Sequence, residues 1–139
     1  MIIGYATGVF DMFHIGHLNL LKRAKEQCDY LLVGVSTDEC VMSYKHRLPV
    51  IPFEHRFAIV SAIRFVDEVV PQKTMDKLAF LKIRHFDIMF HGDELKGSEL
   101  YNKYELEFEQ YGAKIVYLPH TKGISSSLLR PHDVEKVSE

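Results

Sequence analysis

Residues 8–17 read Gly-Val-Phe-Asp-Met-Phe-His-Ile-Gly-His, and they join two segments of different periodicity. Residues 1–5 form a short apolar run that predicts a strand, whereas apolar residues recur at helical spacing in residues 18–28. We therefore expect residues 8–17 to form a strand-to-helix turn. In an open α/β sheet, such a turn lies at the carboxyl ends of the strands, where ligands usually bind.

This turn carries two histidines and two glycines that together suit an anion. His14 and His17 are three residues apart, so they share one face of the first helical turn. The helix start attracts an anion, and Gly8 and Gly16 would let the backbone approach it closely. Two alternatives stay open: histidines that only pack or face water, and a zinc site. The zinc site would lack both the glutamate of the His-Glu-x-x-His motif and an evident third ligand.

Composition narrows the class of protein. The chain has 139 residues, of which 47% are apolar and 26% charged, as is typical of one globular domain. Its net charge is −2 and its basic residues are scattered, which argues against a nucleic-acid partner. Cys28 and Cys40 lack Cys-x-x-Cys spacing, so we expect free thiols in a reducing cytoplasm. No apolar run is long enough to span a bilayer, and we expect a cytoplasmic protein without a membrane partner.

Strand and helix candidates alternate along the chain. The predicted strands after the first are residues 30–36, 68–70, 87–91 and 114–118. The predicted helices after the first are residues 53–63, 75–83, 99–111 and 125–129, with a loop or irregular helix at residues 37–50. This alternation predicts an α/β fold with a doubly wound, parallel, five-stranded sheet. We expect one domain over residues 1–130 and a short tail over residues 131–139.

Two motifs at opposite ends of the chain resemble signatures of one family. Residues 14–17, His-Ile-Gly-His, resemble the His-x-Gly-His signature of the nucleotidyltransferase superfamily. Residues 121–127, Thr-Lys-Gly-Ile-Ser-Ser-Ser, resemble the second signature of its cytidylyltransferase branch. Matches to that branch also occur at residues 53–56 and 63–69. The sequence is therefore similar to the cytidylyltransferase family, and within it to the bacterial glycerol-3-phosphate cytidylyltransferases.

The resemblance implies a Rossmann-like nucleotidyltransferase fold and a reaction. The phosphate of a phosphorylated alcohol attacks the α-phosphorus of CTP, giving a CDP-alcohol and pyrophosphate with Mg²⁺ and without a covalent enzyme intermediate. Glycerol 3-phosphate is the expected acceptor, and a homodimer is the expected assembly. Two alternatives stay open: an ATP-dependent adenylyltransferase of the same fold, and a regulatory module that binds nucleotide without catalysis.

The resemblance also assigns roles to residues. His14 and His17 would hold the triphosphate and the developing pyrophosphate, and Asp11 would orient a histidine or help place magnesium. Lys45 is expected to act in catalysis and to meet the acceptor, with Lys77 as a further acceptor contact. The expected nucleotide contacts are Gly8, Val9, Phe10, Ile15, Gly16, Arg47, Arg64, His120, Thr121, Lys122, Gly123, Ile124, Ser125, Ser126 and Ser127. No protein ligands for a metal are expected.

Three positions depart from the family pattern, and two further arginines are ambiguous. Val9 replaces a usual hydroxyl residue, His120 replaces an arginine, and Leu95 replaces a tryptophan. His120 exchanges a permanent charge for a titratable ring. Arg56 and Arg64 lie in apolar helical stretches, where they either reach the surface or serve a phosphate or a structural ion pair.

Overall fold

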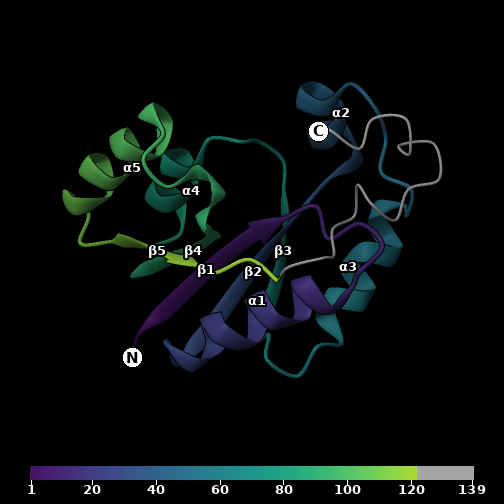
Figure 1. Ribbon diagram of the computed structural model, residues 1–139, viewed down its shortest axis with the longest axis horizontal. Coiled ribbons are helices and arrows are strands. Elements are labelled where there is room, and N and C mark those ends of the chain that lie inside the picture. The colour runs from purple at the N-terminus through teal and green to yellow at the C-terminus, as the bar shows by residue number, and fades with distance from the viewer. Residues whose placement is uncertain (122–139) are drawn as a thin grey trace.

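A computed structural model describes residues 1–121 of the chain. Its centre is a parallel sheet of five strands in the order β3-β2-β1-β4-β5 (Figure 1). The strands are β1 (Ile3–Gly8), β2 (Tyr30–Ser36), β3 (Glu68–Gln72), β4 (Ile88–Gly92) and β5 (Lys114–Leu118). The chain winds outward from β1 to β3 and then crosses back to β4, which confirms the doubly wound prediction. The strand order reverses between β1 and β4, where open α/β sheets bind their ligands.

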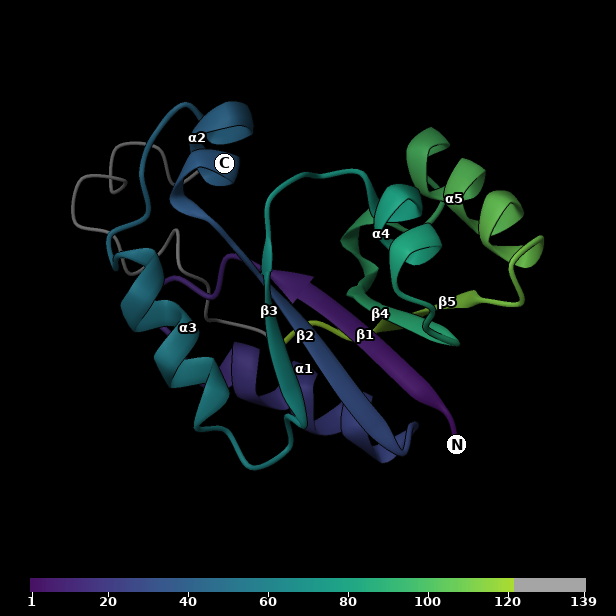
Figure 2. The same ribbon diagram turned by 180° about the vertical axis from the view of Figure 1, so that it is seen from behind.

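Helices cover both faces of the sheet. They are α1 (Ile15–Glu26), α2 (Asp38–Lys45), α3 (Phe53–Ser61), α4 (Lys77–Ile83) and α5 (Glu99–Glu109), with a short 3₁₀ helix η1 (Asp93–Leu95) after β4. α1 and α3 lie on one face, and α4 and α5 lie on the other (Figures 1 and 2). α2 follows directly after β2, beyond the carboxyl ends of the strands.

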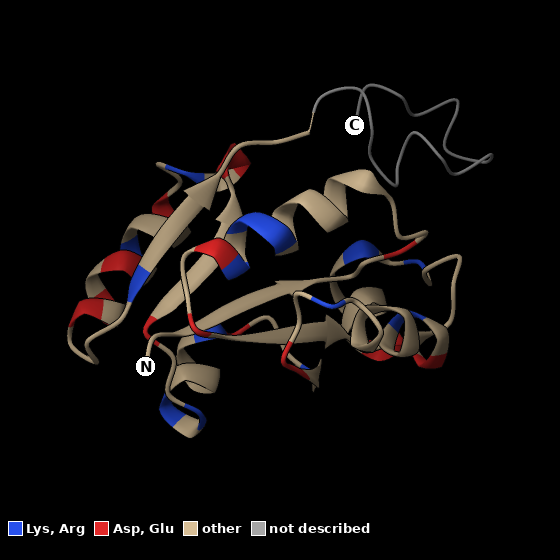
Figure 3. Ribbon diagram, turned by 90° about the horizontal axis from the view of Figure 1, so that it is seen from below, with Lys and Arg blue, Asp and Glu red and all other residues tan. Residues whose placement is uncertain are grey.

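The core forms two layers, one on each face of the sheet. Leu31, Val33 and Val35 of β2 pack with α1 and α3, whereas Leu32 packs in the second cluster with α4 and α5. β2 is buried from Leu31 to Ser36, as its continuous apolar run predicted. In the view of Figure 3, lysines and arginines are interspersed with acidic residues rather than gathered on one element.

The structure corrects several predicted element boundaries. β1 runs on to Gly8, because its pairing with β2 continues to Val35. α1 begins at Ile15 rather than at residue 18, with a cap described below. β3 continues through Pro71 to Gln72. An edge strand tolerates a proline, and within residues 1–121 β3 pairs only with β2.

Part of the predicted loop at residues 37–50 is a regular helix. The Thr37 hydroxyl caps α2 by accepting a hydrogen bond from the Cys40 amide at 3.1 Å. α2 ends at Lys45 and is capped by His46, whose φ of 58° is left-handed. The predicted helix at residues 125–129 and the domain boundary at residue 130 lie outside the described residues. Both cysteines are free thiols, and no helix within residues 1–121 has the length and apolarity needed to cross a membrane.

Candidate active site

The turn after β1 has an unusual backbone. Phe10 and Met12 have φ values of 55° and 50°, a left-handed conformation that side-chain-bearing residues rarely adopt. The Phe10 ring turns inward into the core beneath α1 and meets the His17 ring edge-on at 5.4 Å between centroids. A Cβ on Gly8 would come within 3.1 Å of the Phe10 ring, so a larger residue here would require that ring to shift by a few tenths of an ångström. Such strain persists only where surrounding contacts determine it.

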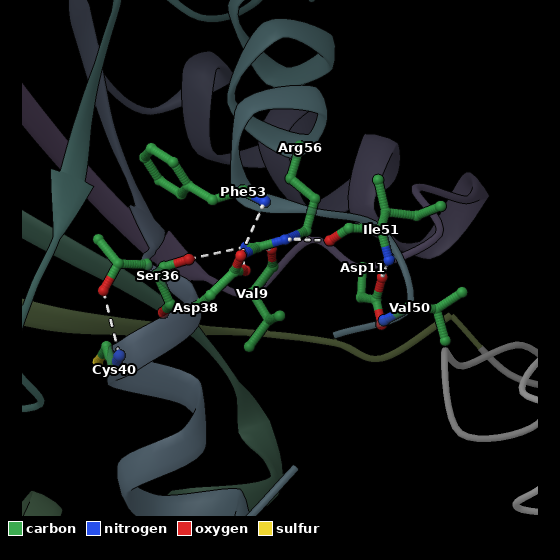
Figure 4. Close-up of polar contacts among 10 residues, drawn as sticks. Val9, Asp11, Ser36, Asp38, Cys40, Val50, Ile51, Phe53 and Arg56 are labelled. Carbon is green, nitrogen blue, oxygen red and sulfur yellow. Dashed lines mark hydrogen bonds and ion pairs between the residues drawn. The ribbon is translucent and has the colours of Figure 1, made fainter. Parts of the chain in front are cut away.

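Arg56 supplies many of those contacts (Figure 4). Its side chain is 1% exposed, and its Nη1 donates to the carbonyl oxygens of Val9 and Ser36, both at 2.7 Å. Its Nε donates to the Ile51 carbonyl at 2.8 Å, and its Nη2 pairs with the Asp38 carboxylate at 2.6 Å. Arg56 therefore ties the ends of β1 and β2 to the segment before α3. The sequence left open whether Arg56 reaches the surface, binds a phosphate or forms a structural ion pair. The structure shows the ion pair, with Asp38.

Asp11 fixes the same turn from the other side. Its carboxylate is buried and accepts hydrogen bonds from the amides of Val50 and Ile51, each at 2.8 Å (Figure 4). It also lies close enough to His17 to favour that ring's protonated form electrostatically. The sequence did not predict the anchoring of residues 50–51, because the partners are about forty residues away along the chain.

His14 and His17 cap α1 reciprocally. The Gly16 amide donates to Nδ1 of His14 at 3.0 Å, and the His14 amide donates to Nδ1 of His17 at 3.2 Å. This is a capping box built from two imidazoles. Since both Nδ1 atoms act as acceptors, each neutral ring carries its proton on Nε2. The rings stack with 3.8 Å between their centroids and 24° between their planes.

Both rings are neutral at physiological pH. Burial lowers the pKa of His14, and burial together with the nearby His14 lowers the pKa of His17 to about 3. Within residues 1–121, neither Nε2 has a hydrogen-bond partner. The site therefore presents two N–H donors beside the start of a helix, an arrangement suited to phosphate oxygens. In the described part of the chain, neither histidine belongs to a group of three ligands that could hold zinc.

A cavity of about 410 Å³ opens over the carboxyl ends of the strands. Gly8, His14 and His17 line it at its centre, from β1 and α1. The rest of the lining comes from the segments after β4 and β5, from the ends of β2 and β3, and from α4 and α5. This volume lies within the range of small-molecule sites. The cavity thus spans the point where the strand order reverses, and it includes the turn at residues 8–17 that the sequence predicted at the carboxyl ends of the strands.

Most of the predicted site residues within residues 1–121 meet in this cavity. Those that line it are Gly8, Val9, His14, Gly16, His17, Lys77, His120 and Thr121. Leu95 also lines the cavity, so all three departures from the family pattern, at positions 9, 95 and 120, face the same space. The three departures that the resemblance identified therefore gather in one pocket.

Other predicted site residues lie elsewhere. Phe10 is in the core, and Ile15 is exposed at the start of α1. Lys45 ends α2 and Arg47 follows it; the cavity lining drawn from residues 1–121 includes neither, although it includes the adjacent Tyr44. Arg64 is exposed in the turn before β3, at the amino ends of the strands, so this chain does not bring it to the cavity. The predicted contacts at residues 122–127 lie outside the described residues.

Lys77 is a buried cation at the first position of α4. It is 4% exposed, and burial lowers its pKa to about 8. No acceptor for its ammonium group is found within residues 1–121. A desolvated ammonium that lines a cavity is well placed to bind an anionic ligand.

Two residues of α1 that were not predicted as site residues dock the segment after β5 onto this helix. The Asn19 side chain donates to Oγ1 of Thr121 at 3.0 Å, and Nη1 of Arg23 donates to the Pro119 carbonyl at 3.2 Å. The spacing of four between Asn19 and Arg23 places them on one helix face, which was the available signal. These bonds bring His120 and Thr121 to the same cavity as the histidine pair.

One group of side chains within residues 1–121 has the composition of a metal site. Ligand atoms of Asp93, Glu94 and His120 lie within 4.8 Å of one another, and all three residues are exposed. His120 Nδ1 is 3.5 Å from a Glu94 carboxylate oxygen. Mg²⁺ prefers oxygen ligands and is commonly held by one or two carboxylates together with substrate phosphates. The two carboxylates beside the cavity fit that preference.

Comparison with known proteins points to one family. A family model described as Cytidylyltransferase-like matches residues 5–131, which include all the residues that line the cavity. The chain is 38% identical over 124 residues to glycerol-3-phosphate cytidylyltransferase from Bacillus subtilis (strain 168), covering 88% of this chain and 90% of the relative. It is 40% identical over 92 residues to ethanolamine-phosphate cytidylyltransferase from Mus musculus, covering 66% of this chain and 22% of the relative. A crystal structure of the lipopolysaccharide core biosynthesis protein from Thermoplasma volcanium GSS1 aligns with a TM-score of 0.73 at 27% identity, covering 89% of this chain and 99% of that chain.

Proposed function

This chain belongs to the cytidylyltransferase-like family, and we propose that it transfers CMP from CTP to a phosphorylated alcohol, releasing pyrophosphate. The observation that carries the proposal is the pair of Nε2–H donors of His14 and His17 in a cavity at the start of α1. Glycerol 3-phosphate is the acceptor we propose, because a relative that matches most of this chain carries that name.

In this proposal the histidine pair stabilises charge rather than moving a proton. The acceptor phosphate is already an anion, so its attack on the α-phosphorus needs no general base. Negative charge develops on the departing pyrophosphate, and fixed N–H donors aimed at it lower the barrier. The neutral state of both rings is sufficient for this role, since each Nε2 keeps its proton.

Asp11 and Arg56 act as positioning residues. They hold the strained turn between β1 and α1 through the backbone of Val9, Val50 and Ile51. A donor array that is rigid before the substrate arrives does not have to reorganise during the reaction.

The acceptor is proposed to occupy the side of the cavity formed by β2, β3 and α4. Lys77 offers a buried positive charge there, and Lys45 lies nearby beside Tyr44, a residue of the cavity lining. The nucleotide then takes the side formed after β4 and β5, where His120 and Thr121 lie. Arg47 and residues 122–127 are proposed to complete the nucleotide site.

Mg²⁺ is the proposed cofactor, bound mainly by the CTP phosphates, with Asp93 and Glu94 as carboxylates beside the cavity that would contribute ligands. The ion would neutralise charge on the triphosphate. The homodimer and the cytoplasmic location expected from the sequence stay predictions.

The test is product formation with purified protein, MgCl₂, CTP and glycerol 3-phosphate. We expect equimolar pyrophosphate and CDP-glycerol, the latter identified by mass spectrometry. Turnover with ATP instead of CTP would show that the chain is an adenylyltransferase. CTP binding without pyrophosphate release, across a panel of phosphorylated alcohols, would indicate a regulatory nucleotide-binding module instead.

A further inference from the structure

One buried polar atom in the cavity wall has no partner within residues 1–121. This atom is Oε1 of Gln72, a residue that is 6% exposed, ends β3 and lines the cavity. Buried side-chain oxygens almost always accept a hydrogen bond, and leaving one unpaired costs free energy. An orphan acceptor on the wall of a ligand cavity therefore indicates that a ligand supplies the missing donor.

The orientation of the Gln72 amide is fixed by its other atom. Nε2 donates to the Thr74 carbonyl oxygen at 3.1 Å. Rotating the amide by 180° would place Oε1 against that carbonyl oxygen, and two acceptors would then face each other. The oxygen is therefore the atom left for the ligand.

Lys77 lines the same cavity, two residues after Met75, whose sulfur lies 3.8 Å from Nε2 of Gln72. Its ammonium is a donor and a positive charge, and it finds no acceptor within residues 1–121. A ligand that satisfies both Lys77 and Gln72 therefore needs an anionic oxygen and a hydrogen-bond donor. The sheet order places Gln72 two strands away from β1 on the side opposite β4 and β5, and therefore away from the proposed nucleotide site.

We propose that Gln72 determines acceptor specificity: its Oε1 accepts a hydrogen bond from a free hydroxyl of the acceptor while Lys77 binds the acceptor's phosphate. This inference rests on the proposed function, and it names the substrate class as polyol phosphates. Phosphocholine has no donor to offer Oε1. Phosphoethanolamine has one, but its ammonium would lie near the positive charge of Lys77.

The experiment compares two acceptors with wild-type protein and two variants. The acceptors are glycerol 3-phosphate and propyl phosphate, which lacks both hydroxyls. Propyl phosphate is also measured as a competitive inhibitor, so that an inhibition constant is obtained even if it reacts slowly. The variants are Gln72→Met, which removes both amide atoms, and Gln72→Glu, which keeps an acceptor oxygen but loses the Nε2 donor. Gln110→Met, an exposed glutamine at the end of α5, is the matched control.

We expect wild type to prefer glycerol 3-phosphate about tenfold or more, the worth of one hydrogen bond to a buried acceptor. Gln72→Met should reduce the preference for glycerol 3-phosphate over propyl phosphate to about threefold or less, with the KM for CTP unchanged. Gln72→Glu and Gln110→Met should both keep the wild-type preference. A uniform loss on both acceptors in Gln72→Met, or loss of the preference in Gln72→Glu, would overturn the inference while CMP transfer stands. Absence of pyrophosphate release from CTP with every acceptor would instead overturn the proposed function, and the inference with it.

Discussion

The main-chain amide of His14 donates to Nδ1 of His17 at 3.2 Å, and the two imidazole rings stack at 3.8 Å between centroids. This relationship does two things at once. It satisfies a backbone donor at the start of α1, which would otherwise lack a partner. It also leaves Nε2 as the protonated atom of His17, so the helix cap itself determines which atom faces the cavity.

The first prediction concerns the tautomers of both histidines. Nitrogen-15 NMR of the free protein at pH 7 should show His14 and His17 as neutral Nε2–H rings. His17 should stay neutral down to about pH 4, because its pKa is lowered to about 3. His85, which is exposed between α4 and β4, serves as an internal reference. An Nδ1–H tautomer at either position would contradict the capping geometry.

The second prediction concerns Lys77 and pH. Its folded-state pKa is lowered to about 8, so the ammonium is charged below that value and neutral above it. Since the charged form binds the acceptor phosphate, kcat/KM for the acceptor should fall about tenfold per pH unit above 8. Lys77→Arg should abolish this limb, because guanidinium stays charged throughout the range.

Lys82 on the same helix provides the control for this profile. It is exposed, so Lys82→Arg should leave the pH dependence unchanged. A limb near pH 8 that persists in Lys77→Arg would assign the titration to another group.

The third prediction concerns His120, where the family usually has an arginine. His120→Arg should lower the KM for CTP about tenfold, because a guanidinium can make a bidentate, charge-assisted contact with phosphate. His85→Arg makes the same chemical change outside the cavity lining of residues 1–121 and should have no effect. An unchanged KM in His120→Arg would remove this position from the nucleotide site.

The fourth prediction concerns Arg56. Arg56→Met removes the cation paired with Asp38 and the donor to three carbonyl oxygens, so the free energy of unfolding should fall by about 3–5 kcal/mol. Chemical denaturation measures this loss. Arg64→Met, which removes an exposed arginine, should stay within about 0.5 kcal/mol of wild type. Equal losses of unfolding free energy in the two variants would mean that the hydrogen bonds of Arg56 contribute little to stability.

Local patterns predicted the parts of the molecule that depend on local physics. The apolar run of β2 and the helical spacing after His17 each predicted an element correctly, and the turn between β1 and α1 lines the cavity. The expected doubly wound sheet follows from their alternation. Helix α2 was less evident, because its Thr37 cap is followed by a polar and basic stretch without strong apolar periodicity.

Residues whose partners are distant in sequence escaped prediction. Arg56 belongs to a network that joins β1, β2 and residue 51, and its spacing within α3 gives no sign of those partners. Gln72 looks like an ordinary polar residue after a proline, and its orphan oxygen appears only once the cavity has formed. For Arg64, a motif match predicted a nucleotide contact, but the structure places this residue at the amino ends of the strands, away from the cavity.

The most direct test of the account is the rate of pyrophosphate release from CTP and glycerol 3-phosphate by His14→Ala and His17→Ala. The account predicts that kcat falls by about 10²–10³-fold in each variant, the usual loss when one donor to a developing anion is removed. Circular dichroism should show the α/β fold retained in both. Turnover within a few-fold of wild type in either folded variant would contradict the central claim that this histidine pair stabilises the departing pyrophosphate.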